Sequence, residues 1–258
     1  MSSRVNPIIL QITNIIAVVA TLVVDALANI LPINGVTTGE VADAYPNLFT
    51  PPGYVFAIWG VIYVLLAVFM VFQARPNQRG EQYLQDISFF HLLGAIGNTS
   101  WIFLFHYEQI VLAVIPIVVL LISLIIMYVR LGIGIRDVPR NQMLAVHLPV
   151  SVYLGWISLA TIAGIASALN VLIPGIPIPT QVMLTVIMLV VALVLTLLML
   201  FMRKDIAFGL VVIWASTGVV VKQLATYPLI GITAGVVAAV VTISIIIVAL
   251  REAEIVSF

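Results

Sequence analysis

The chain has 258 residues, of which 63% are hydrophobic and only 8% are charged. So few polar residues cannot cover a water-soluble globule, and the composition indicates an integral membrane protein. Ten Lys and Arg residues balance ten Asp and Glu residues, so no basic excess favours nucleic acid as a partner. The chain has no cysteine, which excludes disulfides and thiolate metal sites within it.

Apolar stretches long enough to cross a bilayer recur along the whole chain. A helix needs about 20 apolar residues to span the hydrocarbon. We expect eight membrane-spanning helices, over 8–31, 54–73, 87–107, 109–131, 143–168, 180–202, 205–223 and 228–250. With both termini cytoplasmic, every Lys and Arg except Lys222 falls in a cytoplasmic segment, as the positive-inside rule requires. The predicted fold is therefore an all-α integral membrane protein, with a bundle of five helices followed by three more.

Two connections interrupt this pattern. The first, LPINGVTTGEVADAYPNLFTPP (31–52), shows no obvious secondary structure but holds aromatic residues among its prolines. Connections of this length are usually lids, binding loops or disordered segments, and we expect a packed lid on the outer side. The second, NVLIPGIPIPTQ (170–181), is broken by prolines. It predicts two domains, a five-helix bundle at 1–169 and a three-helix extension at 170–258.

Polar residues form a stripe on the first predicted helix. At 100° per residue, one face carries Asn14, Thr21, Asp25 and Asn29. Polar side chains inside a membrane tend to face the bundle interior or a cavity. Two interpretations stay open, because this face suits close packing against another helix, and Asn14, Asp25 and Asn29 equally suit a polar path for a small molecule or an ion.

The helices expected at 87–107 and 143–168 combine aromatic, small and polar residues. Their candidate residues are His91, Gly94, Asn98, Trp101 and Phe105 on the first, and Tyr153, Trp156 and Ala160 on the second. Glycines beside an aromatic ring and an amide leave room for a flat ligand, but they equally let another helix approach closely. His91 is of a type that ligates metals, yet a hydrogen-bonded His is commoner, and we assign no metal site.

Prolines and aromatic residues crowd the entrance of the second predicted helix. The stretch LFTPPGYVFAIWGVIYVLLAVFMVFQ (48–73) begins as a loop and continues as an apolar run. Its notable residues are Pro51, Pro52, Tyr54, Trp59 and Tyr63. Trp and Tyr gather at membrane interfaces as anchors, and rigid aromatic side chains also suit the rim of a pocket for a flat ligand. Both interpretations apply to Tyr54.

Three short motifs occur in order on the second, third and fifth predicted helices. They are PPGYVFAIWGVIY (51–63), GNTSWIFLF (97–105) and VYLGWISLAT (152–161). Together they resemble the signatures of the tryptophan-rich sensory protein (TspO/MBR) family, also called the translocator protein family. The first motif is similar to that family's P-P-x-W-V-F followed by W-x-x-L-Y. The second is similar to N-x-x-W-x-x-x-F, and the third to Y-L-x-W-x-x-x-A-T. The resemblance covers about residues 8 to 168 and implies a five-helix bundle closed on one side by the loop between its first two helices.

The resemblance also implies a class of ligand. Members of this family bind porphyrins, haem and other flat apolar molecules, and light-dependent porphyrin breakdown has been proposed for some. Tyr54 stands where the family has a Trp. With the residues selected above, the expected ligand-binding set is Pro51, Pro52, Tyr54, Trp59, Tyr63, Asn98, Trp101, Phe105, Tyr153, Trp156 and Ala160.

The sequence thus predicts a multi-pass membrane protein that binds a planar apolar ligand, such as a tetrapyrrole, in a lidded helical pocket, with a sensory or carrier role. The alternative is a small-molecule or ion transporter with a polar path along the first helix. Enzyme activity on a bound ligand is left open, with a non-catalytic role favoured and no catalytic residue assigned, since the chain lacks the usual hydrolase and kinase motifs.

The partners follow from the same observations. We expect the lipid bilayer and a planar apolar small molecule as partners, and no nucleic acid. The sequence is also compatible with a homodimer. No cofactor is expected to be obligatory, although porphyrin and haem are candidate ligands. The expected location is a prokaryotic plasma membrane, with both termini in the cytoplasm.

Overall fold

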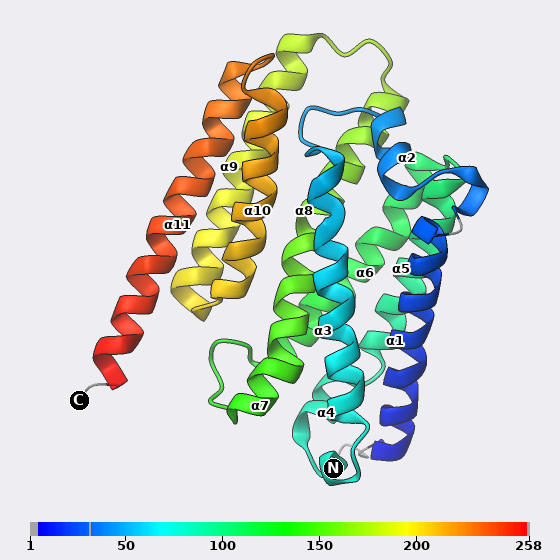
Figure 1. Cartoon of the computed structure of the whole chain (residues 1–258), viewed down its shortest axis with the longest axis vertical. Helices are drawn as coiled ribbons and strands as arrows, with labels where there is room; N and C mark the ends of the chain where they lie inside the picture. The colour runs from blue at the N-terminus through cyan, green and yellow to red at the C-terminus, as the bar shows by residue number, and fades with distance from the viewer. Residues whose placement is uncertain (1–4, 31, 257–258) are drawn as a thin grey trace.

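The computed structural model describes residues 5–30 and 32–256, apart from the side chains of Asn29 and of residues 252–256. Within this part of the chain every regular element is a helix (Figure 1). The long helices are α1 (Pro7–Ile30), α3 (Ile58–Gln73), α5 (Phe90–His106), α6 (Ile110–Leu131), α8 (Leu148–Leu172), α9 (Ile178–Arg203), α10 (Ile206–Gln223) and α11 (Pro228–Val256). The predicted all-α fold is confirmed.

Short helical elements connect these long helices. They are α2 (Thr38–Ala44), α4 (Gln82–Ile87), α7 (Arg140–Gln142), the 3-10 turns Ile33–Gly35, Gly53–Ala57 and Pro76–Gln78, and a π-helical turn over Met143–His147. The turn Gly53–Ala57 leads directly into α3, so the α-helix predicted from residue 54 begins at Ile58.

The structure contains the expected long helices of a multi-pass membrane protein. Seven helices in the described part of the chain are long and apolar enough to cross a bilayer. The remaining long helix, α5, has 17 residues, which is about the minimum for a span. It packs against α1 and α6 along the same bundle. Its start is delayed from residue 87 to Phe90 because Ser88, with φ 49°, separates it from α4.

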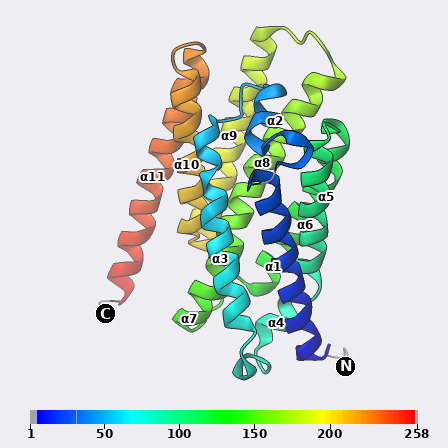
Figure 2. The ribbon, with the colours of Figure 1, turned by 45° about the vertical axis from the view of Figure 1, so that its right-hand side comes forward.

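The long helices form two groups. α1, α3, α5, α6 and α8 make a bundle, and α9, α10 and α11 stand beside it (Figures 1 and 2). α10 joins the groups by packing against α8, where Gly155 brings the α8 backbone close to Val211 and Phe208. The division into domains at 169/170 stays a prediction, and α8 itself continues across it to Leu172.

The lid contains a helix where the sequence suggested no regular structure. α2 begins after Thr37, whose hydroxyl accepts a hydrogen bond from the Glu40 backbone N–H, while the Glu40 carboxylate accepts one from the Thr37 N–H at 2.7 Å. This reciprocal arrangement is a capping box, and its T-x-x-E signature is present in the sequence TTGE. The hydrogen bond from the Thr37 backbone N–H lowers the pKa of the exposed Glu40 carboxyl.

The two helix groups also meet at a tight backbone contact. Gly134 lies in the loop after α6 with φ +75°, a conformation that side chains other than glycine rarely adopt. A Cβ atom at this position would clash with the carbonyl oxygen of Arg203, at the end of α9. Glycine therefore allows the loop of the first group to lie directly on the α9–α10 turn of the second.

We predict that Gly134→Ala destabilises the fold more than Gly175→Ala, because Gly175 has a positive φ but no such backbone contact. Gly175 has φ +83°, but a Cβ atom there would meet nothing within 4 Å, so Gly175→Ala should cost only the left-handed backbone strain, about 1–2 kcal/mol. Thermal unfolding of both variants in detergent, followed by circular dichroism, measures the difference. Equal shifts of Tm would show that the Gly134–Arg203 contact adds nothing to stability.

Candidate ligand-binding site

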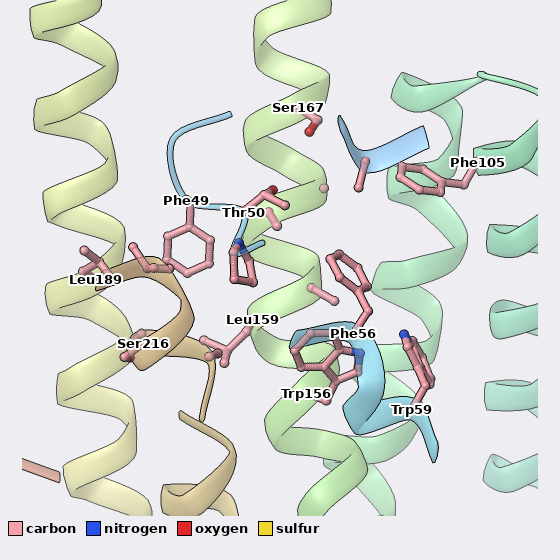
Figure 3. A pocket seen from close by; sticks show the side chains of 18 of the residues that line it. Phe49, Thr50, Phe56, Trp59, Phe105, Trp156, Leu159, Ser167, Leu189 and Ser216 are labelled. Atoms are coloured by element: carbon pink, nitrogen blue, oxygen red, sulfur yellow. The ribbon is translucent and has the colours of Figure 1, made fainter. Parts of the chain in front are cut away.

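A mainly apolar cavity of about 70 Å³ lies beneath the lid, between the two helix groups (Figure 3). Figure 3 shows Phe49, Leu189 and Ser216 on one side of it and Phe56, Trp59 and Phe105 on the other. Its walls are Ala42, Phe49, Thr50 and Pro51 from the lid; Phe56 and Trp59; Trp101 and Phe105 from α5; Trp156, Leu159, Ala160, Ala163, Gly164 and Ser167 from α8; Leu189 and Ala192 from α9; and Ala215, Ser216 and Val219 from α10.

Trp59 is the centre of the aromatic wall. Its ring stacks on Trp101 of α5, with ring centroids 6.4 Å apart, and meets Trp156 of α8 edge to face at 6.2 Å. Trp101 stacks in turn on Phe105, and Phe56 meets Trp156 edge to face. Each such aromatic pair contributes about 0.5–1.5 kcal/mol beyond the burial of its area. The wall is therefore held in one arrangement by contacts between three different helices.

Helical spacing explains how α8 contributes most of the cavity wall. Trp156, Ala160, Ala163 and Ser167 follow one another at intervals of three or four residues, which places them on one face. Trp156 is 3% exposed, and its indole N–H has no hydrogen-bond partner among the described residues. A buried N–H without a partner costs free energy, so this wall residue holds an unpaired donor.

The predicted ligand-binding residues fall into three groups. Six of them line the cavity: Pro51, Trp59, Trp101, Phe105, Trp156 and Ala160. Pro52 and Tyr54 lie outside its walls, and Tyr54 is 52% exposed with its ring edge to face with Trp214 of α10. The remaining three, Tyr63, Asn98 and Tyr153, belong to a polar cluster beside the aromatic wall.

This polar cluster is centred on Asp25 of α1. The Asn98 side-chain amide donates a hydrogen bond to the Asp25 carboxylate at 2.8 Å, and the Tyr153 hydroxyl donates to the Asn98 amide oxygen at 3.2 Å. Tyr63 is a further neighbour of the carboxyl group. Asp25 and Asn98 are both at most 1% exposed. The cluster joins α1, α5 and α8 and reaches the aromatic wall where Tyr153 contacts Trp59.

The polar stripe of α1 faces the interior of the bundle. Asn14, Thr21 and Asp25 are buried, as is the neighbouring Ala28. The Asn14 amide has no hydrogen-bond partner among the described residues for either its nitrogen or its oxygen. The side chain of Asn29, which completed the predicted stripe, lies outside the described part of the structure. The stripe therefore contacts protein, and whether it also forms a path stays a hypothesis.

The glycines of α5 contact a neighbouring helix. A Cβ on Gly97 would stand 2.8 Å from the Pro116 carbonyl oxygen of α6, and one on Gly94 would stand 3.3 Å from Leu120. These two positions serve close packing of α5 on α6 and do not line the cavity. His91 lies edge to face with Phe69, and the described residues include no group of three or more His, Cys, Asp or Glu side chains arranged for a metal.

Sequence reasoning missed the wall formed by the second helix group. Leu189 and Ala192 of α9 and Ala215, Ser216 and Val219 of α10 close the side of the cavity opposite Trp59. These residues are small or aliphatic, so their sequence pattern is the same as that of ordinary helix packing. Phe49 and Thr50 of the lid were also missed, although the aromatic character of the lid was noted.

Hydrogen bonds attach the lid to three helices. The Asn47 amide donates to the Ser167 hydroxyl at 2.8 Å and to the Ala163 carbonyl oxygen at 3.2 Å, both on α8. Gln223 of α10 donates to the Leu48 carbonyl oxygen, and a ring nitrogen of His106 on α5 lies 3.0 Å from the Thr38 hydroxyl. These bonds hold the lid over the cavity.

A further contact joins the outer surface of the lid to the loop after α5. The Tyr45 hydroxyl donates to the Glu108 carboxylate at 2.8 Å, and this interaction raises the pKa of the Tyr45 hydroxyl. Lys222 of α10 lies 3.9 Å from Asp43 of α2. Both pairs are too exposed to hold the lid by themselves, since surface ion pairs contribute little.

We predict that Asn47→Ala loosens the lid without unfolding the bundle. Besides its bonds to α8, the Asn47 side chain accepts hydrogen bonds from the Phe49 and Thr50 backbone N–H groups, so its loss leaves buried donors unpaired. Hydrogen exchange measured by mass spectrometry should accelerate across residues 38–50. The matched change Asn77→Ala, at an exposed position in the turn after α3, should leave the exchange of the lid as it is in the unchanged protein.

Comparison with known protein families identifies the chain over most of its length. The model of a family described as TSPO-like protein matches residues 11–247. The chain belongs to the TSPO-like protein family. The match runs well past the 8–168 region that carried the three motifs, so it includes most of the three C-terminal helices of this TSPO-like chain. Searches of curated proteins and of solved structures gave no match.

Proposed function

We propose that this TSPO-like membrane protein binds a planar apolar ligand in the cavity centred on Trp59. The observation that carries the proposal is the apolar hollow under the lid, whose wall holds the three tryptophan rings Trp59, Trp101 and Trp156. Flat conjugated molecules gain dispersion and stacking energy against such rings. Small-molecule sites are typically apolar hollows with a few polar groups that fix the orientation of the ligand.

The polar groups of the cavity suggest the chemistry of the ligand. The Trp156 indole N–H is buried, with no partner among the described residues, and the Ser216 hydroxyl lies on the opposite side. A ligand with an apolar ring system and a hydrogen-bond acceptor, such as a carbonyl or carboxylate, would satisfy the indole. Porphyrins have both features, and the family resemblance favours them. A sensory or carrier role fits reversible binding of this kind.

The size of the cavity constrains how a porphyrin could bind. Its volume of about 70 Å³ is well below the roughly 300–1,000 Å³ of most ligand pockets. A tetrapyrrole therefore requires the walls to separate, whereas a smaller ring compound needs less movement. The division of the wall between the lid and two helix groups is compatible with such movement, because these parts are linked by few covalent connections.

Protoporphyrin IX titration, followed by tryptophan fluorescence in detergent, tests the proposal. We expect saturable quenching at micromolar concentrations and at least roughly tenfold weaker binding in Trp156→Phe, since this change removes the unpaired donor and part of the stacking surface. The matched control is Phe103→Leu, which alters an aromatic side chain on α5 that is 44% exposed to the bilayer side.

The result also tests the role of the second helix group. Because α9 and α10 form one wall, a chain that ends near Asn170 should bind less tightly than the full chain. Equal affinity of the unchanged protein, Trp156→Phe and Phe103→Leu would place any bound porphyrin outside the cavity. The absence of saturable quenching in the unchanged protein would remove the proposal altogether.

A second candidate function is transport of a small molecule or ion, which the buried stripe of α1 supports. The Asn14 amide, without a partner among the described residues, and the Asp25–Asn98–Tyr153 hydrogen bonds place polar groups at two depths along the same helix. Buried polar groups of this kind in a membrane often belong to a substrate or proton path. Two further expectations also stay proposals. One is assembly as a homodimer, and the other is location in a plasma membrane with both termini in the cytoplasm.

We predict that the transport function, if present, depends on Asp25 and not on Trp156. Proteoliposomes that hold a pH-sensitive dye should show proton flux that falls at least about tenfold in Asp25→Asn, because the buried carboxylate of the proposed path is lost. Trp156→Phe leaves the α1 stripe intact and serves as the comparison. Flux that is absent from the unchanged protein, or equal in Asp25→Asn, would argue against transport along α1.

A further inference from the structure

A second hollow opens on the bilayer side of the molecule, where α3, α8 and α10 meet. This apolar groove has a volume of about 440 Å³, and its walls include Ile58, Val61, Val152, Leu210, Val211 and Trp214. Val61, Leu210 and Trp214 are more than 40% exposed, and their helices span the membrane. The groove therefore faces the hydrocarbon of the bilayer.

The groove and the aromatic cavity are neighbours along the same three helices. On α3, Ile58 lines the groove and the next residue, Trp59, lines the cavity. On α10, Trp214 lines the groove and Ala215 lines the cavity. On α8, Val152 and Trp156 are separated by a single turn. Neighbouring residues of the same helices thus line the candidate site and the bilayer-facing groove.

A contact beside this boundary joins α10 to the turn Gly53–Ala57 that leads into α3. We call it the α3–α10 seam, and it consists of Val55, Trp214 and Gly218. The Trp214 indole N–H donates a hydrogen bond to the Val55 carbonyl oxygen at 2.9 Å. Val55 is fully buried, and its side chain packs so closely on Gly218 that a Cβ there would clash with Val55 Cγ2. The rest of the seam is apolar contact, so this hydrogen bond is its polar link.

The seam is held by fewer side-chain hydrogen bonds than the lid. Raising the lid would break the bonds of Asn47 and Gln223 and the His106–Thr38 contact together. Opening the seam breaks the Trp214 hydrogen bond and separates apolar surfaces that lipid chains can cover. An apolar ligand is also far more concentrated in the hydrocarbon than in water, so it arrives at the seam and not at the lid.

We infer that the groove is the entrance of the candidate site, through which a planar apolar ligand passes from the bilayer when the α3–α10 seam opens. This inference rests on the proposed function, because it requires that the cavity accept a ligand. The occupant of the groove is that same ligand, dissolved in the membrane. Trp214 and Gly218 thereby acquire a role in controlling the rate of binding, while the cavity residues control its strength.

A disulfide across the seam tests the inference. The chain has no cysteine, so the pair Val55→Cys and Gly218→Cys introduces only the intended bond, between positions close enough for one. In nanodiscs, stopped-flow quenching by protoporphyrin IX should show association at least about tenfold slower in the oxidised pair than in the same protein after reduction. An equal rate with the disulfide formed, as judged by mass spectrometry, would overturn the entrance.

Two single variants decide the question without a disulfide. Trp214→Phe removes the hydrogen bond of the seam but keeps an aromatic ring, so association and dissociation should both accelerate about three- to tenfold with little change in affinity. Asn47→Ala loosens the lid instead. If Asn47→Ala accelerates association more than Trp214→Phe does, the ligand enters under the lid and the inference is wrong.

The same experiment separates the failure of the entrance from the failure of the proposed function. Saturable quenching by protoporphyrin IX at equilibrium, with association rates that neither the disulfide nor Trp214→Phe changes, would overturn the entrance and leave the binding site. The absence of any saturable quenching in the unchanged protein would overturn the proposed function, and the entrance would fall with it.

Discussion

The contacts of the Trp59 ring are the interaction on which the candidate site depends. Trp59 belongs to the first turn of α3, yet its ring reaches Trp101 on α5 and Tyr153 and Trp156 on α8. Between helices in a membrane there is no hydrophobic driving force, so association depends on packing of this kind and on hydrogen bonds. The ring thus fixes the relative positions of three helices and, through them, the shape of the cavity.

The site combines an apolar interior with a polar cover. The cavity is separated from the aqueous side by a lid whose backbone cannot form regular helix throughout, and side chains such as Asn47 and Gln223 pair its remaining backbone groups. Toward the hydrocarbon the wall is mostly aliphatic, and the Trp214–Val55 hydrogen bond is its polar link. The difference in solvent on the two sides explains why the two boundaries are built from different residue types.

Most of the fold could be predicted from the sequence, because the bilayer imposes a length and an apolar composition on each span. The differences occur where local backbone conformation overrides that rule, as at Ser88, whose positive φ separates α4 from α5, and at Thr37 and Glu40, whose capping box starts α2. Apolar runs and prolines do not indicate where α2 begins, because the signal for its start is the T-x-x-E pattern of Thr37 and Glu40.

The candidate site was predictable in part. Trp59, Trp101 and Trp156 carry a family pattern, and the structure brings them together around one hollow. Ala192, Ala215 and Ser216 could not be found in the same way, since nothing in their residue types separates a cavity wall from a helix interface. Asn98 and Tyr153 followed the family pattern but face Asp25, because the same helices present a second, polar face beside the aromatic one.

A wall shared between two helix groups couples the cavity to the membrane around it. The distance between Leu189 or Ser216 on one side and Trp59 on the other depends on how α9 and α10 rest against α8. Lateral pressure in the bilayer acts on that same interface, because α9, α10 and α11 present much of their surface to lipid. By thermodynamic linkage, a membrane that compresses the groups would disfavour the proposed ligand, and a ligand bound there would resist the compression. Occupancy of the proposed site and the mechanical state of the bilayer would then act on one and the same helix contact.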